Sequence, residues 1–283
     1  MNYLITGATG NIGSIVVNRL LDRGERPRVL ARDAQKARLR FGDRVDICAG
    51  DFSDATSMAA ALSRVDAFLL VSSVDDLAAR DEVAAKAAKA AGVKHLVKIS
   101  SMSIPQKTIM TGMWHAQGEA AVRASEVPFT FVRSAGFMEN CLQWASSIKS
   151  EGVVRSSAGD GKTPVVHSQD IADVATKALT TQAYIGETLP VSGPEMLSYP
   201  EMLAKIGAVI GKPLRYEVLS DEEERRQLVA RNRPAHMVDA IISIFQATRE
   251  GRIAGVTDTV ERVLGRKPLS FDRWLEQHAA AFQ

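Results

Sequence analysis

The first 24 residues, MNYLITGATGNIGSIVVNRLLDRG (1–24), decide the fold of the N-terminal part of the chain. A short apolar run over 2–6 leads directly into glycines spaced three apart, the first at Gly7 and the last at Gly13. An amphipathic pattern typical of a helix follows over 11–23. A strand, a glycine turn and a helix form the opening of a βαβ unit, because glycine allows both the tight turn and the close packing of helix on strand.

The same alternation continues through the first two-thirds of the chain. We predict further strands at 26–32, 45–50, 66–73, 95–101 and 129–135, and helices at 33–40, 54–63, 78–91 and 115–125. Most of these strands carry continuous apolar runs, as expected of parallel strands that are covered on both faces. The chain is therefore predicted to be an α/β protein with a Rossmann-type, doubly wound parallel sheet, whose strand carboxyl ends meet at one ligand-binding edge.

The rhythm of strand and helix changes after residue 136. We predict a dinucleotide-binding domain over 1–190, with an excursion near 137–165 that contributes to a second lobe. The remaining residues, 191–283, are mostly helical in pattern and form the smaller lobe on the substrate side. This lobe is expected to lie over the carboxyl ends of the strands.

Composition excludes several classes of partner. The 283 residues carry a net charge of +2, so no strong electrostatic case exists for nucleic acid or a membrane surface. No apolar run approaches the roughly 20 residues that span a bilayer. Cys48 and Cys141 follow neither a disulfide nor a zinc pattern, and the histidines show no metal-ligand spacing. We expect a cytoplasmic protein without a metal that acts on a small molecule, with a homodimer as the candidate assembly.

The glycine loop predicts a dinucleotide site. Backbone N–H groups of such a loop can approach a pyrophosphate, and the following helix directs its positive end at the phosphates. The G-x-x-G-x-x-G spacing, with Gly10 in the middle, departs from the common G-x-G-x-x-G fingerprint.

The end of the second strand indicates which dinucleotide is bound. An NAD site usually places Asp or Glu there for the ribose 2′-hydroxyl, whereas this chain has Arg32. A guanidinium suits a 2′-phosphate, and Lys36 can add a second charge one helical turn later. Asp33 has the alternative role of capping the next helix. We therefore predict that NADP(H) is preferred over NAD(H).

Several longer stretches carry a family resemblance. Together with Arg32 they are GATGNIG (7–13), AGDFSD (49–54), AAKAAGVKHLVKISS (87–101) and FTFVRSAGFMEN (129–140). The chain resembles NmrA-like atypical short-chain dehydrogenases/reductases over nearly its whole length, and is closest in pattern to bacterial NADPH:quinone oxidoreductases, azoreductases and triphenylmethane reductases. The resemblance implies binding of NADP(H). Some members reduce conjugated acceptors, and others are redox sensors without turnover.

The resemblance also implies a set of cofactor-binding residues. Those at the phosphates and the adenosine are Gly7, Thr9, Gly10, Asn11, Ile12, Arg32, Asp51, Phe52, Ser72 and Ser73. Those beside the nicotinamide and its carboxamide are Ser100, Ser101, Ala135, Gly136 and Phe137. Plainer roles stay open, since Asp51 can be a turn residue and the serines can cap strand ends.

Apolar side chains near the expected nicotinamide suggest the kind of substrate. Met102, Trp114 and Met138 offer flexible or flat apolar surface, which suits a planar conjugated ligand. The alternative is that some of them belong to the ordinary core.

The proton relay of most short-chain dehydrogenases, a Tyr-x-x-x-Lys pair, is absent from the sequence. None of the four tyrosines has a lysine four residues later. Three interpretations follow: His115 donates the proton, an already electrophilic acceptor needs no enzyme-bound acid, or no reaction occurs and the chain is a redox sensor. We favour an NADPH-dependent reductase of a quinone, azo compound or related acceptor. A sugar-nucleotide epimerase or dehydratase is disfavoured, because that chemistry needs the tyrosine.

Overall fold

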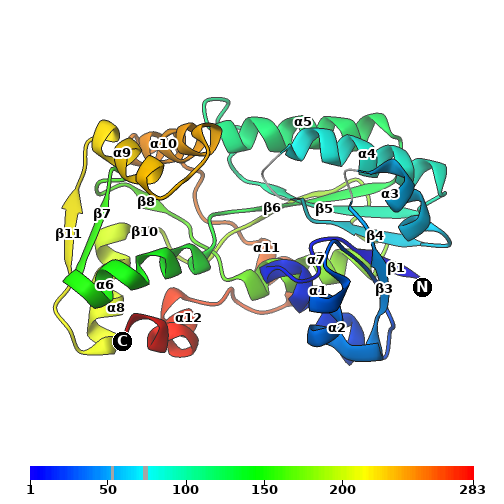
Figure 1. The fold of residues 1–283 in the computed structure, drawn as a ribbon, viewed down its shortest axis with the longest axis horizontal. Helices are drawn as coiled ribbons and strands as arrows, with labels where there is room; N and C mark the ends of the chain where they lie inside the picture. The colour runs from blue at the N-terminus through cyan, green and yellow to red at the C-terminus, as the bar shows by residue number, and fades with distance from the viewer. Residues whose placement is uncertain (52–53, 73–75) are drawn as a thin grey trace.

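The computed structural model describes residues 1–51, 54–72 and 76–283, and it has two lobes (Figure 1). Phe52 and Ser73 lie outside the described residues, so their predicted roles at the cofactor stay predictions. The larger lobe holds the N-terminal strands with helices on both sides of them. The smaller lobe holds the later helices and two short two-stranded sheets.

The larger lobe is built on a seven-stranded sheet with the order β3-β2-β1-β4-β5-β6-β9, in which every neighbouring pair is parallel. Its strands are β1 (Tyr3–Ile5), β2 (Arg28–Ala31), β3 (Asp46–Ala49), β4 (Ala67–Leu70), β5 (His95–Ser101), β6 (Phe129–Ser134) and β9 (Thr188–Val191). The direction of winding reverses between β1 and β4, which makes their carboxyl ends the point where a ligand can enter between strands. The predicted doubly wound sheet is confirmed.

Helices cover both faces of this sheet (Figure 1). One face carries α1 (Asn11–Asp22), α2 (Ala34–Phe41), α7 (Ser168–Leu179) and α11 (Thr259–Leu264). The other face carries α3 (Ala55–Leu62), α4 (Leu77–Ala90) and α5 (Met110–Ala124). Strand residues alternate between the two cores, since Ile5 packs with the first group and Leu4 with the second.

Helix α5 begins at Met110, five residues before the predicted start at 115. Its first turn contains Gly112, which is a poor helix former and hides the pattern in the sequence. A Cβ atom at Gly112 would lie 2.4 Å from the Ser103 carbonyl oxygen. Glycine therefore lets this turn pack directly on the loop that follows β5.

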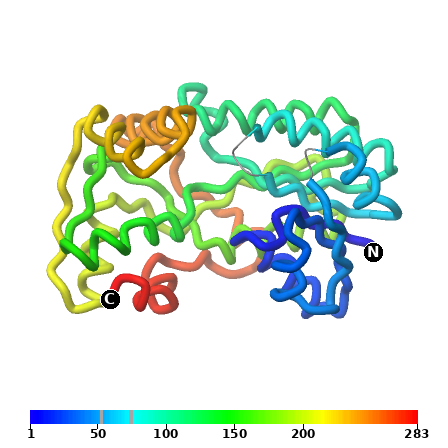
Figure 2. The backbone as a smooth tube through the Cα atoms, viewed as in Figure 1, coloured from blue at the N-terminus to red at the C-terminus, as the bar shows by residue number. Residues whose placement is uncertain are grey.

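The smaller lobe draws on three separate stretches of the chain, and the chain crosses between lobes several times (Figure 2). Its elements are η2 (Met138–Trp144), α6 (Ala145–Glu151), β7 (Val153–Ser156), β8 (Lys162–Thr163), β10 (Leu197–Ser198), α8 (Tyr199–Ile210), β11 (Arg215–Val218), α9 (Asp221–Ala230), α10 (Ala235–Arg249), α12 (Phe271–His278) and η3 (Ala279–Phe282). A short 3-10 helix, η1 (Gly42–Arg44), belongs to the larger lobe. Strands β7 and β11 pair in parallel, and β8 and β10 pair antiparallel. The domain limit at residue 190 stays a prediction.

Helix α10 of the smaller lobe contacts the larger lobe directly. The Met110 amide at the start of α5 donates a hydrogen bond to Ser243 Oγ on α10 at 3.2 Å. After α10, the Thr257 hydroxyl donates to the Pro190 carbonyl oxygen at 2.8 Å. These contacts hold α10 and the segment after it over the carboxyl ends of the strands.

Candidate functional site

Two adjoining cavities lie at the carboxyl ends of the strands, where the winding of the sheet reverses. The larger has a volume of about 630 Å³ and the smaller about 300 Å³. Gly7 and Val71 line both, so the two cavities meet at the ends of β1 and β4. This is the position expected for an extended ligand in an open parallel sheet.

The glycine loop lies where the two cavities meet and is shaped to accept an anion. Gly7 has a φ of +59°, a left-handed conformation that favours glycine. A Cβ atom at Gly13 would lie 2.3 Å from the Gly7 carbonyl oxygen, so α1 can approach β1 this closely only without a side chain there. Gly10 caps α1 without a side-chain hydrogen bond, which leaves the first N–H groups of the helix available to phosphate oxygens. The loop therefore fits a pyrophosphate.

The smaller cavity has a cationic wall. Arg32 and Lys36 line it, together with Thr9 and Asp51. Within the described residues, no hydrogen bond or ion pair engages the Arg32 guanidinium or the Lys36 ammonium group. Asp33 accepts a hydrogen bond from the Lys36 amide at 2.9 Å and so caps α2, as its alternative role predicted. The chemistry of this wall fits a phosphate group.

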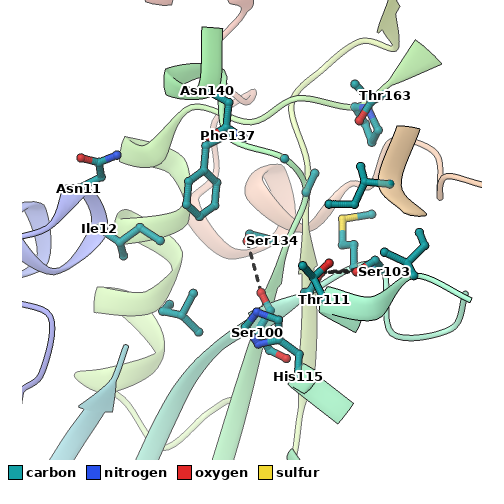
Figure 3. A pocket seen from close by; sticks show the side chains of 18 of the residues that line it. Asn11, Ile12, Ser100, Ser103, Thr111, His115, Ser134, Phe137, Asn140 and Thr163 are labelled. Carbon is teal, nitrogen blue, oxygen red and sulfur yellow. Dashed lines mark hydrogen bonds between the residues drawn. The ribbon is translucent and has the colours of Figure 1, made fainter. Parts of the chain in front are cut away.

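The floor of the larger cavity is formed by hydroxyl groups at the strand ends (Figure 3). The Ser100 hydroxyl donates to Glu119 Oε1 at 2.7 Å, and the Ser72 hydroxyl donates to Asp81 Oδ1. The Ser134 hydroxyl donates to the Ser100 carbonyl oxygen at 3.3 Å. These bonds fix the hydroxyls, which makes the floor a rigid polar surface.

His115 lies on α5 and lines the larger cavity (Figure 3). Its Nδ1 atom is buried and has no hydrogen-bond partner within the described residues. Burial, and to a smaller extent the positive charge of Lys98, lower the pKa of the imidazole from 6.5 to about 3. His115 is therefore a neutral imidazole near pH 7 and carries no second proton that it can donate.

The remaining walls of the larger cavity come from both lobes. Their apolar members are Ile12, Ile99, Met102, Ile109, Ala135, Phe137, Pro164, Ile244, Ile253 and Ala254. Uncharged polar groups complete the lining and include Asn11, Ser101, Ser103, Gln106, Thr111, Asn140 and Thr163. Among the described residues, no Lys, Arg, Asp or Glu side chain lines this cavity. Its walls suit an uncharged, largely apolar ligand.

Most of the predicted site residues of the described chain line one of the two cavities. The larger brings together Gly7, Gly10, Asn11, Ile12, Ser72, Ser100, Ser101, Met102, His115, Ala135, Gly136 and Phe137. The smaller brings together Gly7, Thr9, Arg32 and Asp51.

Two predicted substrate-binding residues lie elsewhere. Met138 is fully buried in the core of the smaller lobe, and it does not line either cavity. Trp114 also lies outside both linings, and its ring meets the His236 ring edge-on with the centroids 6.0 Å apart. Both side chains serve packing between elements.

The sequence did not single out the walls supplied by α10 and the segment after it, which include Ile244 and Ile253. These residues belong to no motif, and the apolar run around Ile244 signals only a helix. Their role depends on a contact between lobes that a local pattern does not encode.

The described residues provide neither a cluster of metal ligands nor a membrane-spanning helix. Across residues 1–51, 54–72 and 76–283, no group of three or more His, Cys, Asp or Glu side chains is placed to hold a metal ion. None of the described helices has both the length and the apolar character needed to cross a bilayer.

Comparison with known proteins gives consistent matches over the whole chain. The model of the NmrA-like family matches residues 2–275. The (4-alkanoyl-5-oxo-2,5-dihydrofuran-3-yl)methyl phosphate reductase of Streptomyces griseus is 40% identical over 281 residues, which cover 99% of this chain and 98% of that protein. The NAD(P)H azoreductase of Xenophilus azovorans is 35% identical over 282 residues, which cover 99% and 98% of the two chains.

A solved structure shares the fold. The NADPH-dependent quinone oxidoreductase of Escherichia coli, solved with NADPH, superimposes with a TM-score of 0.89 over 98% of this chain and 99% of its own, at 23% identity. The family resemblance, the Rossmann-type fold and the oxidoreductase class predicted from the sequence are confirmed by these matches.

Proposed function

The chain belongs to the NmrA-like family, and from that premise we propose that it is an NADPH-dependent reductase that transfers hydride to a conjugated, electron-poor small molecule such as a quinone or an azo compound. One observation carries the proposal: a cavity with two unengaged cations adjoins an uncharged cavity, and a glycine loop joins them. A nicotinamide dinucleotide is the cofactor class, and when bound it supplies the hydride.

The residues present suit that cofactor along its length. The first N–H groups of α1, behind Gly10, would hold the pyrophosphate. Arg32 and Lys36 in the smaller cavity would hold a 2′-phosphate, which supports a preference for NADP(H) over NAD(H). Ser100 and Phe137 would border the nicotinamide in the larger cavity.

We propose that the reaction needs no acid from the protein. The neutral, partly buried His115 carries no spare proton near pH 7, and the structure brings no tyrosine to the lining of the larger cavity within the described residues. A quinone or azo bond is already electrophilic, and solvent can supply the proton after hydride transfer. The protein then contributes by positioning the acceptor and excluding water.

The shape of the larger cavity supports a reductase over a redox sensor. A sensor has less need of a substrate-sized apolar space beside the cofactor, and Trp114 or Met138 would be expected to fill that space. Instead, both side chains lie outside a cavity of about 630 Å³. The names of the Streptomyces griseus and Xenophilus azovorans relatives, which refer to an (alkanoyl-oxo-dihydrofuranyl)methyl phosphate and to azo reduction, also suit a conjugated acceptor.

The direct test is NADPH oxidation by the purified protein with a panel of quinones and azo dyes, followed by the loss of NADPH absorbance. We expect oxidation only when an acceptor is present, with a higher kcat/KM for NADPH than for NADH. Binding of NADPH without oxidation by any acceptor would favour a sensor and contradict the proposal.

We propose a cytoplasmic location and a homodimer as the assembly. Cys48 and Cys141 are both free thiols, which agrees with a reducing compartment such as the cytoplasm. Fluorescent tagging in the source cell would test this. The homodimer stays a prediction from the sequence, and light scattering on the purified protein would test it.

A further inference from the structure

A buried carboxylate on α5 lies directly beneath the floor of the larger cavity. Glu119 is only 1% exposed. Arg133 on β6 donates to both of its oxygens, from Nε to Oε1 at 2.8 Å and from Nη2 to Oε2 at 2.7 Å. The Ser100 hydroxyl at the end of β5 donates to the same Oε1 atom at 2.7 Å. Burial by itself raises the pKa of Glu119, but these hydrogen bonds and the charges of Arg133 and Arg123 outweigh it, so the pKa lies below its usual value.

A second buried carboxylate on α4 repeats this arrangement one strand away. Asp81 and Lys98 have side chains that are 0% exposed, and Lys98 Nζ lies 2.7 Å from Asp81 Oδ2. The Ser72 hydroxyl, just after β4, donates to the other carboxylate oxygen of Asp81. Lys98 Nζ also donates to the Ile99 carbonyl oxygen at 3.1 Å. Each unit thus has a cation from a strand, a carboxylate from a helix, and a serine that lines the cavity.

The absence of a side chain at Gly118 makes room for the Asp81 carboxylate. A Cβ atom at Gly118 would lie 2.0 Å from Asp81 Oδ2, so the α5 backbone packs directly on this carboxylate. Buried ion pairs are costly to desolvate and are often no more stabilising than apolar residues of the same volume. Two such pairs beneath one cavity floor are therefore poorly explained by stability alone. What the units share is the serine that each one orients.

We propose that Asp81 and Glu119 are positioning residues that set the hydrogen-bond polarity of the cavity floor. Because the Ser72 and Ser100 hydroxyl hydrogens are committed to the carboxylates, the serine oxygens present lone pairs to the bound ligand. The floor therefore recognises hydrogen-bond donors, such as the ribose hydroxyls or the amide of a nicotinamide dinucleotide, and not phosphate oxygens, which only accept. This inference rests on the proposed function, because it takes the dinucleotide as the ligand.

The test measures the dissociation constant of NADP⁺ by calorimetry, with no acceptor present. Ser100→Ala and Ser72→Ala should each weaken NADP⁺ binding by about three- to tenfold, the loss expected for one hydrogen bond. Glu119→Gln should also weaken binding, and Ser100→Ala should then add little in the double variant, because both changes remove the same oriented acceptor. Glu217→Gln is the matched control, since it breaks an exposed pair with Arg155 far from the cavities and should leave affinity unchanged.

The direction of the Glu119→Gln effect separates positioning from other roles. Loss of a negative charge near an anionic ligand would by itself tighten binding. Tighter or unchanged binding in the folded variant would therefore overturn the proposal, since it would show that the carboxylate is not needed to keep the Ser100 oxygen free for a donor on the ligand. A purely structural role would lower the melting temperature and leave the affinity of the folded protein unchanged.

Further results distinguish a failure of this inference from a failure of the proposed function. If Glu119→Gln does not fold, the serine variants decide, and unchanged NADP⁺ affinity in both would overturn the inference. Wild-type protein that binds NADP⁺ with the expected serine effects but reduces no acceptor would contradict the reductase and support the inference. If the wild-type protein reduces quinones but both serine variants bind NADP⁺ with normal affinity, the reductase is supported and the inference about the cavity floor is contradicted.

Discussion

The two adjoining cavities are lined by residues of different chemical character. The smaller is formed by one lobe, and Arg32 and Lys36 place unengaged positive charge on its wall. The larger is formed by both lobes, and its described lining contains only apolar and uncharged polar groups, with the nearby charges of Lys98 and Glu119 already paired beneath it. The smaller cavity can therefore select a ligand by its charge. The larger can select only by shape and by the polarity of its hydrogen bonds.

The largest expected effect comes from the loop that joins the cavities. Gly10→Val should abolish dinucleotide binding, because a branched side chain would occupy the space at the helix N-terminus that an anion needs. Circular dichroism should show that the fold is largely intact, and calorimetry should detect no NADPH binding. Gly255→Ala is a suitable control, since a Cβ atom there meets nothing within 4 Å. Unchanged NADPH affinity in folded Gly10→Val protein would show that the loop does not hold the phosphates.

Charge reversal in the smaller cavity should have the next largest effect. Arg32→Glu should weaken NADPH binding by about ten- to a hundredfold, because repulsion replaces a charge-assisted hydrogen bond. NADH, which lacks the 2′-phosphate, should be affected far less. Arg38→Glu on the exposed side of α2 is the control for net charge. Equal losses for both cofactors would mean that Arg32 does not read the 2′-phosphate and that the contrast between the cavities has no role in selecting the cofactor.

A charge introduced into the larger cavity would test whether its uncharged wall determines which acceptor is bound. Ile253→Lys should lower kcat/KM for a neutral naphthoquinone by about tenfold, because the acceptor would have to pack against a partly desolvated ammonium group. The preference should shift toward a sulfonated naphthoquinone, while NADPH affinity stays the same. Val256→Lys, at an exposed neighbouring position, should change neither ratio. If neutral and sulfonated acceptors respond alike to Ile253→Lys, the acceptor does not contact this wall.

A smaller effect is expected at His115. His115→Ala should lower the turnover of a quinone by less than about tenfold, whereas loss of a general acid typically costs about 10²–10⁴-fold. The measurement is kcat at saturating NADPH, with NADPH affinity as the check on the fold. A loss above a hundredfold with normal affinity would identify His115 as the acid and contradict the account without one.

The last expected effect is on stability at acidic pH, and not on binding or turnover. The pKa of His115 is lowered to about 3 by burial, so between pH 6.5 and 3 the unfolded chain binds a proton that the folded chain does not. The folded state therefore loses stability as the pH falls through this window and keeps it above pH 6.5. Urea unfolding at several pH values should show a shallower decline for His115→Ala. An equally steep decline would place the acid sensitivity elsewhere.

The fold was largely predictable because apolar runs and a glycine loop are local signals. The smaller cavity was predictable for the same reason, since Arg32 follows a strand at a recognisable spacing. The larger cavity was not, because Ile244 and Ile253 reach it from another lobe. Met138 and Trp114 show a further limit: an apolar side chain gives no indication of whether it lines a cavity or fills a core.

The buried carboxylates were missed for a different physical reason. Asp81 lies in the sequence DEVAAKAAKA, and Glu119 in HAQGEAAVRA, where each carboxylate has the spacing of a solvated helix face. Only the tertiary fold brings Lys98 and Arg133 from neighbouring strands to neutralise them. A helix pattern records which residues share a face, but not which strand cation lies opposite.

Because the chain crosses repeatedly between the lobes, the two cavities form at different times during synthesis on the ribosome. Every described residue that lines the smaller cavity lies between Thr6 and Arg80, whereas the larger cavity needs Ala254. Strand β7 cannot pair until its partner β11 has been synthesised, roughly 60 residues later. At a translation rate of about 5–20 residues per second, this takes several seconds. During synthesis, the cationic wall of the smaller cavity therefore emerges long before the walls of the larger cavity are complete.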